Sequence, residues 1–566
     1  MRYLTKSIDH DSFSVEQLSS LGAGMFLCIP KKPNMFLPLY HNTKPRVQTL
    51  VVNVVLLLVI ILALPVIVPI VVLFQVHRQI VARLLAFRHG SSFRGLLEGA
   101  DVVWAVQDRS SRAMASVLLL FDKPEHVNDL QAHVDLLRTF RDRFRRHQSD
   151  GAYQKMFWQR RLQWGYYFWT QSERPLSADD YIAPLETVPH CGCLSRRQLC
   201  ALIGSISNRQ CDVTSWELLI GSQPVRLHDG STITRYPVLF RYHHSIADGI
   251  AIFRLFCQDI LDSATAAEEH VWNPDAVKRL SMKAFLTGPN LLRMAFRGPR
   301  FLLNEIFLKN EHNPFCGVAP SEDKIMSWIG EKMDRQPCER PLISVIKKIK
   351  RSVVGCSFTD VFLAAFAMSL RAYCERHGVP VPGSITVGRM QRFQRETKEI
   401  RLRNRSTAVF KSLPVGNLPI VASSLTTITQ LMSLLGAVSG PSRAVQSIAD
   451  ALITHLSVSY LPELLPVPVM RALFARSKFS IALSNIPAFA GTVAVQNYTL
   501  QEATFWVPNI ESNMFGVTIL TTHGRLQIGA VADRKIIAHD DELDLILKNT
   551  LEVLQNMGSI LMEKEN

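Results

Sequence analysis

A long uncharged apolar stretch constrains this chain more than any other feature of its sequence. All 21 residues from Val54 to Phe74 are apolar, and no charged residue occurs between Val47 and Val76. A helix needs roughly 20 apolar residues to cross the hydrocarbon core of a bilayer. A buried helix of this length in a soluble protein would be expected to show a polar face, and this stretch has none. The sequence therefore predicts a membrane anchor over residues 47–77.

Two arrangements of the anchor fit the sequence. Pro65 and Pro69 lie in the middle of it, where proline removes a backbone hydrogen bond and kinks a helix. The first arrangement is a single kinked transmembrane span. The second is a hairpin that turns at the prolines and keeps both ends cytosolic. Basic residues flank the stretch on both sides, so the positive-inside rule assigns no orientation. They are Lys31, Lys32, Lys44 and Arg46 before it, and Arg78, Arg83, Arg88 and Arg94 after it.

The rest of the chain divides by composition around the anchor. From Glu98 onward the pattern is that of a soluble α/β protein, with a strand predicted at Ala115–Phe121 and a helix at Ser357–His377. The expected domains are a polar N-terminal segment (1–46), the anchor (47–77), a basic linker (78–97), and two lobes (98–340 and 341–566).

Charge and cysteine content limit the partners that the chain can have. The net charge is +15, from 63 basic and 48 acidic residues. This charge suits nucleic acid, an anionic membrane surface or a polyanionic molecule such as coenzyme A. The ten cysteines are scattered, which favours a reducing compartment over a disulfide scaffold. The cluster His190–Cys193 lacks the repeated paired spacing of a zinc site, so we expect no metal.

The residues with the clearest chemical potential are His243-His244-Ser245-Ile246-Ala247-Asp248-Gly249. Apolar residues from Pro237 to Tyr242 predict a buried strand before them, and Ile250–Leu261 predicts an amphipathic helix after them. The histidines therefore lie where a strand runs into a loop, a place that often presents reactive side chains. A structural alternative is a pair of core histidines, with Asp248 as the N-cap of the helix.

Strand geometry separates the two histidines, because successive residues point to opposite faces. If the strand continues through His244, that residue shares a face with Phe240 and Tyr242. His243 then shares the other face with Leu239 and Arg241. An imidazole can accept a proton from a hydroxyl group near neutral pH. We expect His244 to face a cavity, and Gly249 to allow a tight turn or a close approach of ligand to backbone.

The heptapeptide HHxxxDG resembles the signature of the CoA-dependent acyltransferase superfamily. Further likeness points to the wax ester synthase/diacylglycerol acyltransferase family within it, and covers roughly Glu98 to Met557. The matching segments are Leu483-Ser484-Asn485-Ile486-Pro487, which resembles an SNxP turn; Phe515–Val517 with Gly524–Leu526 and Gly529–Asp533, which resemble a terminal hairpin; Ser357–Val361, which resembles an Asn-Asp-Val helix start; and Ser215–Glu217, which resembles a Pro-Leu-Trp-Glu segment.

The resemblance implies an α/β fold of two chloramphenicol-acetyltransferase-like lobes with mixed sheets and a channel between them. It also implies transfer of an acyl group from acyl-CoA to a long-chain alcohol or to diacylglycerol. His244 would be the general base, and Asp248 would hold the loop through an arginine. Asp360 would organise the lobe interface beside Thr359, which replaces the family's Asn. Ser484, Asn485 or a backbone N–H would stabilise the oxyanion. The Pro-Leu before Trp216 is missing here.

Three further segments are basic or apolar, and two of them have two interpretations each. The run Lys347, Lys348, Lys350 and Arg351 is either a solvated edge or a contact for the phosphates of coenzyme A or for lipid headgroups. Leu291–Leu308 is either a basic amphipathic helix on a membrane or a linker between lobes. Leu461–Phe474 is apolar and broken by prolines, and we expect that it could dip into a membrane surface.

The sequence thus predicts an acyltransferase with acyl-CoA as co-substrate, no permanently bound cofactor, no metal and no nucleic acid. Its domain would lie on the cytosolic side of the endoplasmic reticulum membrane or on a lipid droplet. Two alternatives remain, a non-catalytic membrane-tethered lipid-binding protein on the same fold and an acyltransferase for small alcohols. Neither the oligomeric state nor the acceptor follows from the sequence.

Overall fold

The structure is a computed structural model, and it divides into two units, Met1–Leu56 and Leu57–Asn566. Backbone is described for residues 37–106, 113–148, 150–211, 214–227, 233–263, 287–331, 341–392, 401–445, 448–474, 478–487, 489, 491–509, 513–522 and 524–562. Most of the polar N-terminal segment predicted at 1–46 lies outside the described residues.

Helix α2 (Leu37–His89) contains the predicted anchor. It is helical through Pro65 and Pro69, and whether it spans a bilayer or returns to the same side stays a prediction. Each proline removes one N–H donor, and the remaining i→i−4 bonds are enough to continue the helix. Among the described residues, Val47–Ser92 is the one helical stretch that is long and apolar enough to cross a membrane, a statement of length and composition only.

The C-terminal end of α2 packs on a small antiparallel sheet. Val81 and Leu85 are buried against Tyr166 and Phe168. The sheet has the order β1-β4-β3, with β1 at Phe93–Leu96, β3 at Trp158–Gln163 and β4 at Tyr166–Gln171. The expected linker at 78–97 is therefore helix and strand, because its apolar residues find a sheet to cover.

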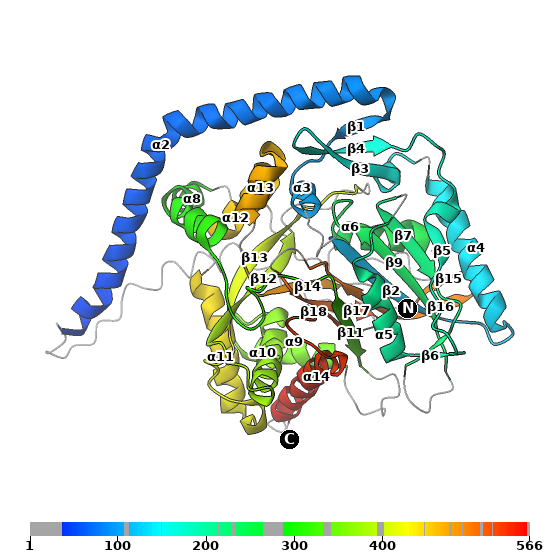
Figure 1. Ribbon diagram of the computed structural model, residues 1–566. Helices are drawn as coiled ribbons and strands as arrows, with labels where there is room; N and C mark the ends of the chain where they lie inside the picture. Colours follow the sequence, from blue (N-terminus) through cyan, green and yellow to red (C-terminus); the bar gives the residue numbers. More distant parts are fainter. Residues whose placement is uncertain are drawn as a thin grey trace, which may run out of the picture. The chain divides into compact units, whose positions relative to one another are not determined.

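The first large sheet is a seven-stranded mixed sheet in the order β10-β15-β16-β2-β9-β7-β5. Its strands are β10 (Asp262–Ser263), β15 (Val493–Val495), β16 (Tyr498–Trp506), β2 (Met114–Asp122), β9 (Tyr236–His243), β7 (Trp216–Ile220) and β5 (Ile182–Pro184). Only the β5–β7 pair is parallel in this sheet as described. Helices α4 (Asp129–His147), α5 (Arg196–Ser207) and α6 (Gly249–Leu255) accompany it in the same lobe (Figure 1).

The second sheet is six-stranded and also mixed, in the order β11-β18-β17-β14-β12-β13. Its strands are β11 (Lys324–Gly330), β18 (Arg525–Asp533), β17 (Phe515–Thr522), β14 (Ile481–Pro487), β12 (Ser384–Arg392) and β13 (Ser406–Pro414). Strand β14 pairs in parallel with both β12 and β17. Helices α9 (Leu342–Ser352), α10 (Phe358–Arg376), α11 (Ile428–Val445) and α14 (Asp540–Met562) pack around it.

The remaining described elements are shorter or lie beside the lobes. They are α3 (Ala100–Ala105), α8 (Gly288–Phe301), α12 (Ile448–Leu464), α13 (Val467–Phe474), the two-stranded pair β6 (Leu194–Ser195) and β8 (Val225–Arg226), π-turns at Phe256–Ile260 and Leu302–Leu308, and 3-10 turns at Gly90–Ser92, Gln154–Phe157, Ala178–Asp180 and Ala422–Ser424.

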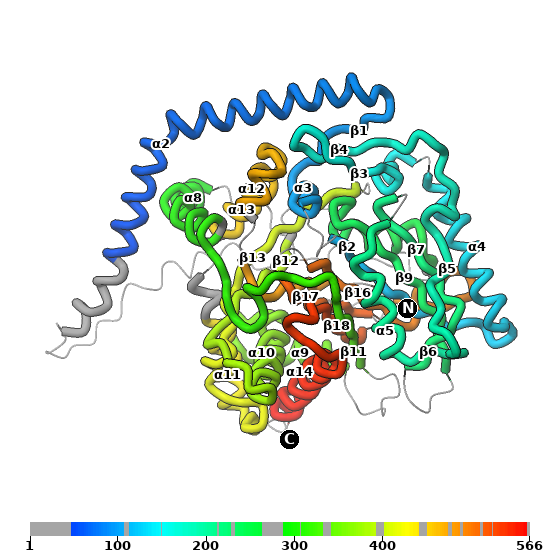
Figure 2. The backbone as a smooth tube through the Cα atoms, in the orientation of Figure 1, coloured from blue at the N-terminus to red at the C-terminus, as the bar shows by residue number. Residues whose placement is uncertain are grey.

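The two lobes exchange strands, so the expected boundary at residue 340 does not separate the sheets. Strand β11 precedes that boundary but pairs with β18 in the second sheet. Strands β15 and β16 follow it, yet β16 pairs with β2 in the first sheet. The tube in Figure 2 shows both crossings, as green chain entering the orange and red sheet and orange chain leaving it. Backbone pairing, rather than position in the chain, therefore decides which lobe a strand joins.

The predicted fold class is confirmed, with two α/β lobes built on mixed sheets. The strand predicted at Ala115–Phe121 lies within β2, and the helix predicted at Ser357–His377 is α10, with Ser357 as its N-cap. Strand β16 is not among the strands predicted from sequence. Both sheets are buried on both faces over much of their length, which gives each lobe a large apolar core.

Candidate active site

The HHxxxDG segment lies between a central strand and a short helix of the first lobe. Strand β9 ends at His243, and α6 begins at Gly249. One carboxylate oxygen of Asp248 accepts the N–H of Ala251 at 3.0 Å, so Asp248 is the N-cap of α6. Asp248 therefore caps α6, as the structural alternative predicted. The cap uses only one of its two carboxylate oxygens.

The second oxygen of Asp248 binds the other half of the chain. It accepts the backbone N–H of Arg405 at 2.9 Å and the hydroxyl of Ser406 at 3.0 Å, where β13 begins. The donor of the first bond is a backbone N–H, so the expected contact of Asp248 with an arginine side chain stays a prediction. Asp248 is buried, so these charge-assisted bonds are shielded from water. The histidine loop is thereby fixed to the second lobe.

A second polar bridge, missed by sequence analysis, centres on Asn404. Its side-chain amide donates to the carbonyl of His244 at 2.7 Å and to the carboxylate of Asp101 at 2.8 Å. The ammonium of Lys155 donates to Asp101 at 2.5 Å and to the carbonyl of Ile246 at 2.7 Å. Burial raises the pKa of Asp101, and the charge of Lys155 opposes that rise. Four chain segments thus meet at the histidine loop.

His243 is held as a hydrogen-bond acceptor. Its Nδ1 receives the backbone N–H of Ser245 at 3.1 Å and lies 2.7 Å from the hydroxyl of the same serine. A backbone N–H can only donate, so Nδ1 is unprotonated and the neutral ring carries its proton on Nε2. Burial, with the charge of Arg160 adding to it, lowers the pKa of His243 well below its ordinary value. This ring is fitted to order the loop.

His244 lies in drier, aromatic surroundings. Its ring stacks on that of Trp104 at a centroid distance of 3.8 Å and lies 6.0 Å from that of Tyr242. Burial lowers the pKa of His244 to about 4, while the negative charge of Asp248 acts in the opposite direction. The ring is therefore neutral at physiological pH. Neutral imidazole is the form that can accept a proton from an alcohol.

Nδ1 of His244 and Oδ1 of Asn404 are buried and make no hydrogen bond within the described residues. The Asn404 side chain nevertheless raises the pKa of His244, against the larger effect of burial, so the two groups are close enough to interact.

Side chains alternate along β9, although the strand ends at His243 and does not continue through His244 as the parity argument assumed. Phe240 and Tyr242 stack at 5.3 Å on the face that continues to His244. Arg241 points the other way and donates to the carboxylate of Glu217. However, a cavity of about 160 Å³ is lined by His243, together with Arg160 and Ser215. Which histidine meets a substrate therefore stays a prediction.

The end of strand β14 reaches the same loop from the second lobe. A Cβ built on Gly249 would lie 2.7 Å from Cδ1 of Ile486, so glycine permits a close approach there. Ser484 is buried and Asn485 is exposed, immediately before Ile486 in the strand. The structure thus brings the predicted SNxP turn next to HHxxxDG, as a lobe-crossing fold requires.

Residues 421–555 match the family model described as the WS/DGAT C-terminal domain, that is, wax ester synthase/diacylglycerol acyltransferase. Over these residues the chain is similar to that family. The matched region contains β16 of the first sheet and β14, β17 and β18 of the second sheet. The match supports acyltransferase activity.

Solved structures share the fold of this chain at low sequence identity. Wax ester synthase/diacylglycerol acyltransferase from Marinobacter aquaeolei VT8 is 14% identical, with a TM-score of 0.53, over 82% of this chain and 99% of that one. Trichothecene 15-O-acetyltransferase from Fusarium sporotrichioides is 10% identical, with a TM-score of 0.55, over 82% of this chain and 94% of that one. A comparison with curated proteins finds no match.

Asp360 lies in the second lobe, at the first turn of α10. Its carboxylate accepts the N–H of Ser357 at 2.8 Å, which completes a capping box. It also pairs with the buried ammonium of Lys411 on β13. Burial lowers the pKa of Lys411, and Asp360 opposes that change. Thr359 is buried beside Asp360. This pair fixes α10 to β13, the strand that begins at the bonds to Asp248.

The predicted basic run lies on α9, and the packing of that helix does not bring it to the histidine loop. Helix α9 packs on α10, α14 and β18 through Val345, Ile346 and Ile349. Lys347 and Arg351 are exposed, whereas Lys348 and Lys350 are half-buried. A role in binding coenzyme A therefore stays a prediction.

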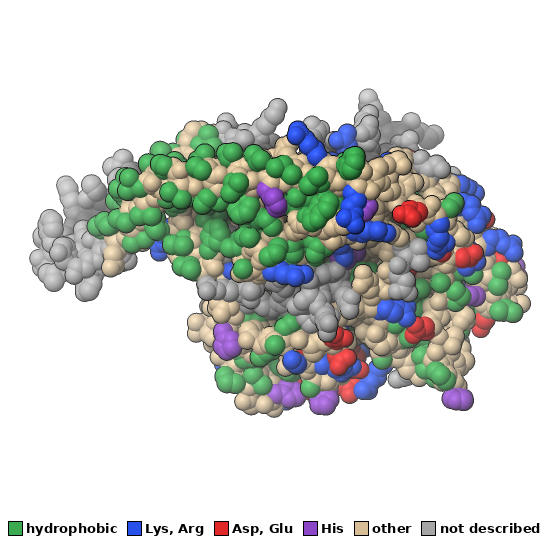
Figure 3. Space-filling model, turned by 45° about the horizontal axis from the view of Figure 1, so that its top comes forward, with side chains coloured by type: hydrophobic (Ala, Val, Ile, Leu, Met, Phe, Trp, Pro, Cys, Tyr) green, Lys and Arg blue, Asp and Glu red, His purple; other side chains and the backbone are tan. Residues whose placement is uncertain are grey.

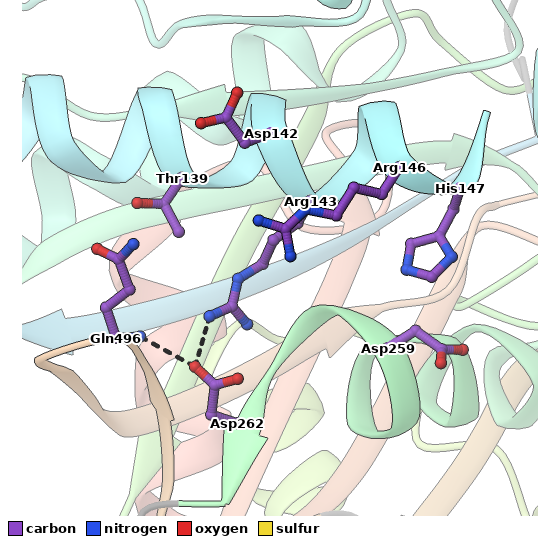
Figure 4. Close-up of a pocket in the computed structure, with 8 residues that line it drawn as sticks. All are labelled: Thr139, Asp142, Arg143, Arg146, His147, Asp259, Asp262 and Gln496. Atoms are coloured by element: carbon purple, nitrogen blue, oxygen red, sulfur yellow. Dashed lines mark hydrogen bonds and ion pairs between the residues drawn. The ribbon is translucent and has the colours of Figure 1, made fainter.

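A second hollow, of about 200 Å³, lies between α4, β10 and β15 (Figure 4). Arg143 donates to Asp262 at 2.5 Å, and the backbone N–H of Gln496 donates to the same oxygen at 3.1 Å. Its lining residues are Thr139, Asp142, Arg143, Arg146, His147, Asp259, Asp262 and Gln496. None of the predicted site residues is among them. Within the described residues, no group of three or more His, Cys, Asp and Glu is arranged to hold a metal ion.

The buried Asp360–Lys411 pair generates a stability prediction. We expect Lys411→Met to lower the free energy of unfolding by about 3–5 kcal/mol, because it leaves the Asp360 carboxylate buried without this partner. The double variant Lys411→Met/Asp360→Asn should recover most of the loss, since no charge is then stranded. The measurement is the midpoint of thermal unfolding for the purified chain. Equal midpoints for the single and double variants would contradict this account.

Proposed function

We propose that the chain is an acyl-CoA-dependent O-acyltransferase that esterifies a lipid alcohol, either a long-chain fatty alcohol or diacylglycerol. One observation carries the proposal, namely that an intact HHxxxDG segment presents a neutral, dry imidazole at His244. The thioester of acyl-CoA is already activated, so no serine or cysteine nucleophile is required. What the reaction lacks without a protein is a base for the alcohol.

The proposed reaction is a single acyl transfer. Nε2 of His244 takes the proton of the acceptor hydroxyl. The oxygen of that hydroxyl attacks the carbonyl carbon of the thioester at the same time. The tetrahedral intermediate then expels the thiolate of coenzyme A, which recovers the proton from the imidazolium. A base of this kind typically contributes about 10²–10⁴-fold to the rate. Low polarity around the ring also strengthens electrostatic interactions with the developing charges.

Asn404 is the proposed positioning residue for the base. If its Oδ1 accepts the Nδ1 proton of His244, the lone pair of Nε2 is left for the acceptor alcohol. The two atoms are buried and otherwise without partners among the described residues, which supports this pairing. The Asn404 amide already donates to the His244 carbonyl, so its position is fixed. Asp248 acts one step further away, by holding Arg405 and Ser406 next to Asn404.

The oxyanion donor is proposed to come from the end of β14. Ile486 contacts Gly249 there, so Ser484 and Asn485 lie on the strand that approaches the loop. The exposed amide of Asn485 or a backbone N–H would stabilise the charge of the tetrahedral oxygen. The apolar stretch of α2 favours water-insoluble substrates and a membrane location, with the lobes on the cytosolic side of the endoplasmic reticulum where acyl-CoA is available.

The function is tested with membranes that contain the chain. Labelled palmitoyl-CoA supplied with hexadecanol or with diolein should yield labelled ester. His244→Ala should lower the rate by about 10²–10⁴-fold, as loss of a general base does. His243→Ala, at the neighbouring buried position, is the matched control and should lose less, because Nδ1 of His243 is already occupied by Ser245.

No ester from any long-chain alcohol or acylglycerol would favour the non-catalytic lipid-binding alternative. Ester from hexanol but from neither lipid would favour the small-alcohol alternative. A comparable loss of rate in both histidine variants, with the fold retained, would contradict the assignment of the general-base role to His244 alone.

Asn404 gives a second prediction, with a readout that packing alone would not change. In the exchange variant Asp101→Asn/Asn404→Asp the net charge is the same, but a carboxylate now lies beside His244. This charge should raise the pKa of His244, so the acidic limb of the kcat/KM profile should move to higher pH by about one unit or more. Asn404→Leu should lower kcat by about tenfold to a hundredfold, less than loss of the base itself. An unmoved acidic limb in a folded exchange variant would exclude Asn404 as the partner of His244.

The pH dependence of the unaltered chain follows from the pKa of about 4 at His244. We expect kcat/KM to stay level from pH 7.5 down to about pH 5 and to fall only as the pH approaches 4. Between the ordinary histidine pKa of 6.5 and about 4, the unfolded chain binds a proton at this position that the folded chain does not. The contribution of His244 to stability therefore decreases as the pH falls through that window. An acidic limb near pH 6.5 would show that the base is solvated.

A further inference from the structure

We propose that the Leu57–Asn566 unit carries a second lipid contact, here called the bilayer face, and that its partner is the surface of an anionic bilayer. The bilayer face comprises three segments outside α2: the β3–β4 turn (162–165), the α12–α13 region (460–473) and the first turns of α8 (287–295). It lies beside the apolar part of α2 that belongs to the same unit, residues 57–76. This inference does not depend on the proposed function.

Large apolar side chains are exposed at each of these three segments. Leu292 on α8 is 72% exposed, Tyr460 on α12 is 63% exposed and Trp164 in the β3–β4 turn is 44% exposed. Leu291, Leu162 and Val469 are exposed as well. In Figure 3 hydrophobic side chains form a band along α2, and Lys and Arg side chains lie towards one end of this band and below it. Contiguous apolar surface of this kind indicates a binding partner.

The segments are joined by direct contacts. The N–H of Val467 donates to the carbonyl of Gly165 at 2.8 Å, and the hydroxyl of Tyr166 donates to the carbonyl of Leu464 at 3.0 Å. The turn after β3 and the α12–α13 junction therefore form one surface. Gly298 of α8 faces Ile453 of α12, so the third segment belongs to a helix that packs on α12.

The same surface continues to the anchor. The ring of His77 on α2 lies 5.6 Å from that of Tyr166 in the β3–β4 hairpin, and Val81 and Leu85 are buried against the hairpin. The apolar residues of α2 thus end where the bilayer face begins. A bilayer that takes in residues 57–76 would meet the hairpin and α13 at its surface.

The charge of these segments selects an anionic bilayer over a second protein. No Asp or Glu occurs in residues 57–89, 158–171, 287–303 or 464–474. Glu463 directly precedes residues 464–474. Its carboxylate accepts the backbone N–H of Gly99 at 2.8 Å. The guanidinium of Arg88 lies 5.8 Å over the ring of Trp164. Arg and Trp together are typical of the headgroup region, where a ring buries its apolar part and arginine reaches phosphate.

The bilayer face also adjoins the histidine loop. Glu463 of α12 holds Gly99, the residue before α3, and Trp104 of α3 stacks on His244. If the proposed function holds, a lipid acceptor would leave the bilayer beside α12 and reach His244 past Trp104. This consequence rests on the proposed function, whereas the bilayer face itself does not.

The test uses the full chain in vesicles of phosphatidylcholine and phosphatidylserine that contain a photoactivatable phosphatidylcholine. After illumination, mass spectrometry should find lipid adducts on peptides from 158–166, 287–295 and 460–473, in addition to α2. Adducts on α2 alone would overturn the proposal. Cross-links between two copies of the chain through Leu292 or Trp164 would also overturn it, because they would assign the surface to self-association.

Two variants and a matched control sharpen the result. Leu292→Asp and Val469→Asp place a charge where the bilayer should lie, and each should lower adduct yield on its own peptide by about tenfold. Val354→Asp is the control, because Val354 is 88% exposed but follows α9, which packs on α10, α14 and β18. Unchanged yields in both test variants would contradict the bilayer face.

Activity separates this inference from the proposed function. Both test variants should slow esterification of diolein in vesicles while leaving esterification of hexanol supplied from water unchanged. If no alcohol is esterified by the unaltered chain, the proposed function fails, and the adduct map still decides the bilayer face.

Discussion

The carboxylate of Asp248 is the contact on which the rest of the site depends. One oxygen begins helix α6, and the other holds the backbone of Arg405 and the hydroxyl of Ser406 at the start of β13. A single buried anion thus sets the position of the histidine loop relative to the second sheet. Because a buried carboxylate without donors is costly, the site assembles only when both lobes are in register.

Strand exchange between the two sheets keeps the lobes in this relative position. Strands β15 and β16 cross into the first sheet and β11 crosses into the second, so each sheet is completed by chain from the other side of residue 340. The ladder bonds of two sheets would have to break before the lobes could separate. Asn404 can therefore stay against His244, at the meeting point of segments that are far apart in the chain. Such rigidity suits a base that must be held close to a reacting hydroxyl.

The two buried histidines differ in the contacts that their rings make. The Nδ1 of His243 is occupied by the backbone of Ser245, whereas His244 stacks on Trp104 with its own Nδ1 unoccupied by any described group. Burial keeps both rings neutral. The same helix α3 that supplies Trp104 touches α12, so the polar centre of the site and the apolar exterior beside α2 are separated by few side chains. The proposed esterification of a lipid alcohol would use both environments.

Local sequence pattern alone determined much of this protein. The apolar run at Val54–Phe74, the strand before His243 and the helix that begins after Ser357 all follow from residue periodicity and short-range bonding, which act within a few positions. The course of α2 through Pro65 and Pro69, the pairing of β16 with β2 and the bridge Asp101–Lys155–Asn404 were decided only by tertiary structure. Asn404 lies 160 residues from the carbonyl that it binds. A hydrogen bond to a backbone carbonyl at such a separation cannot be predicted from a single sequence. Every residue has a carbonyl, and only the fold decides which one lies within reach.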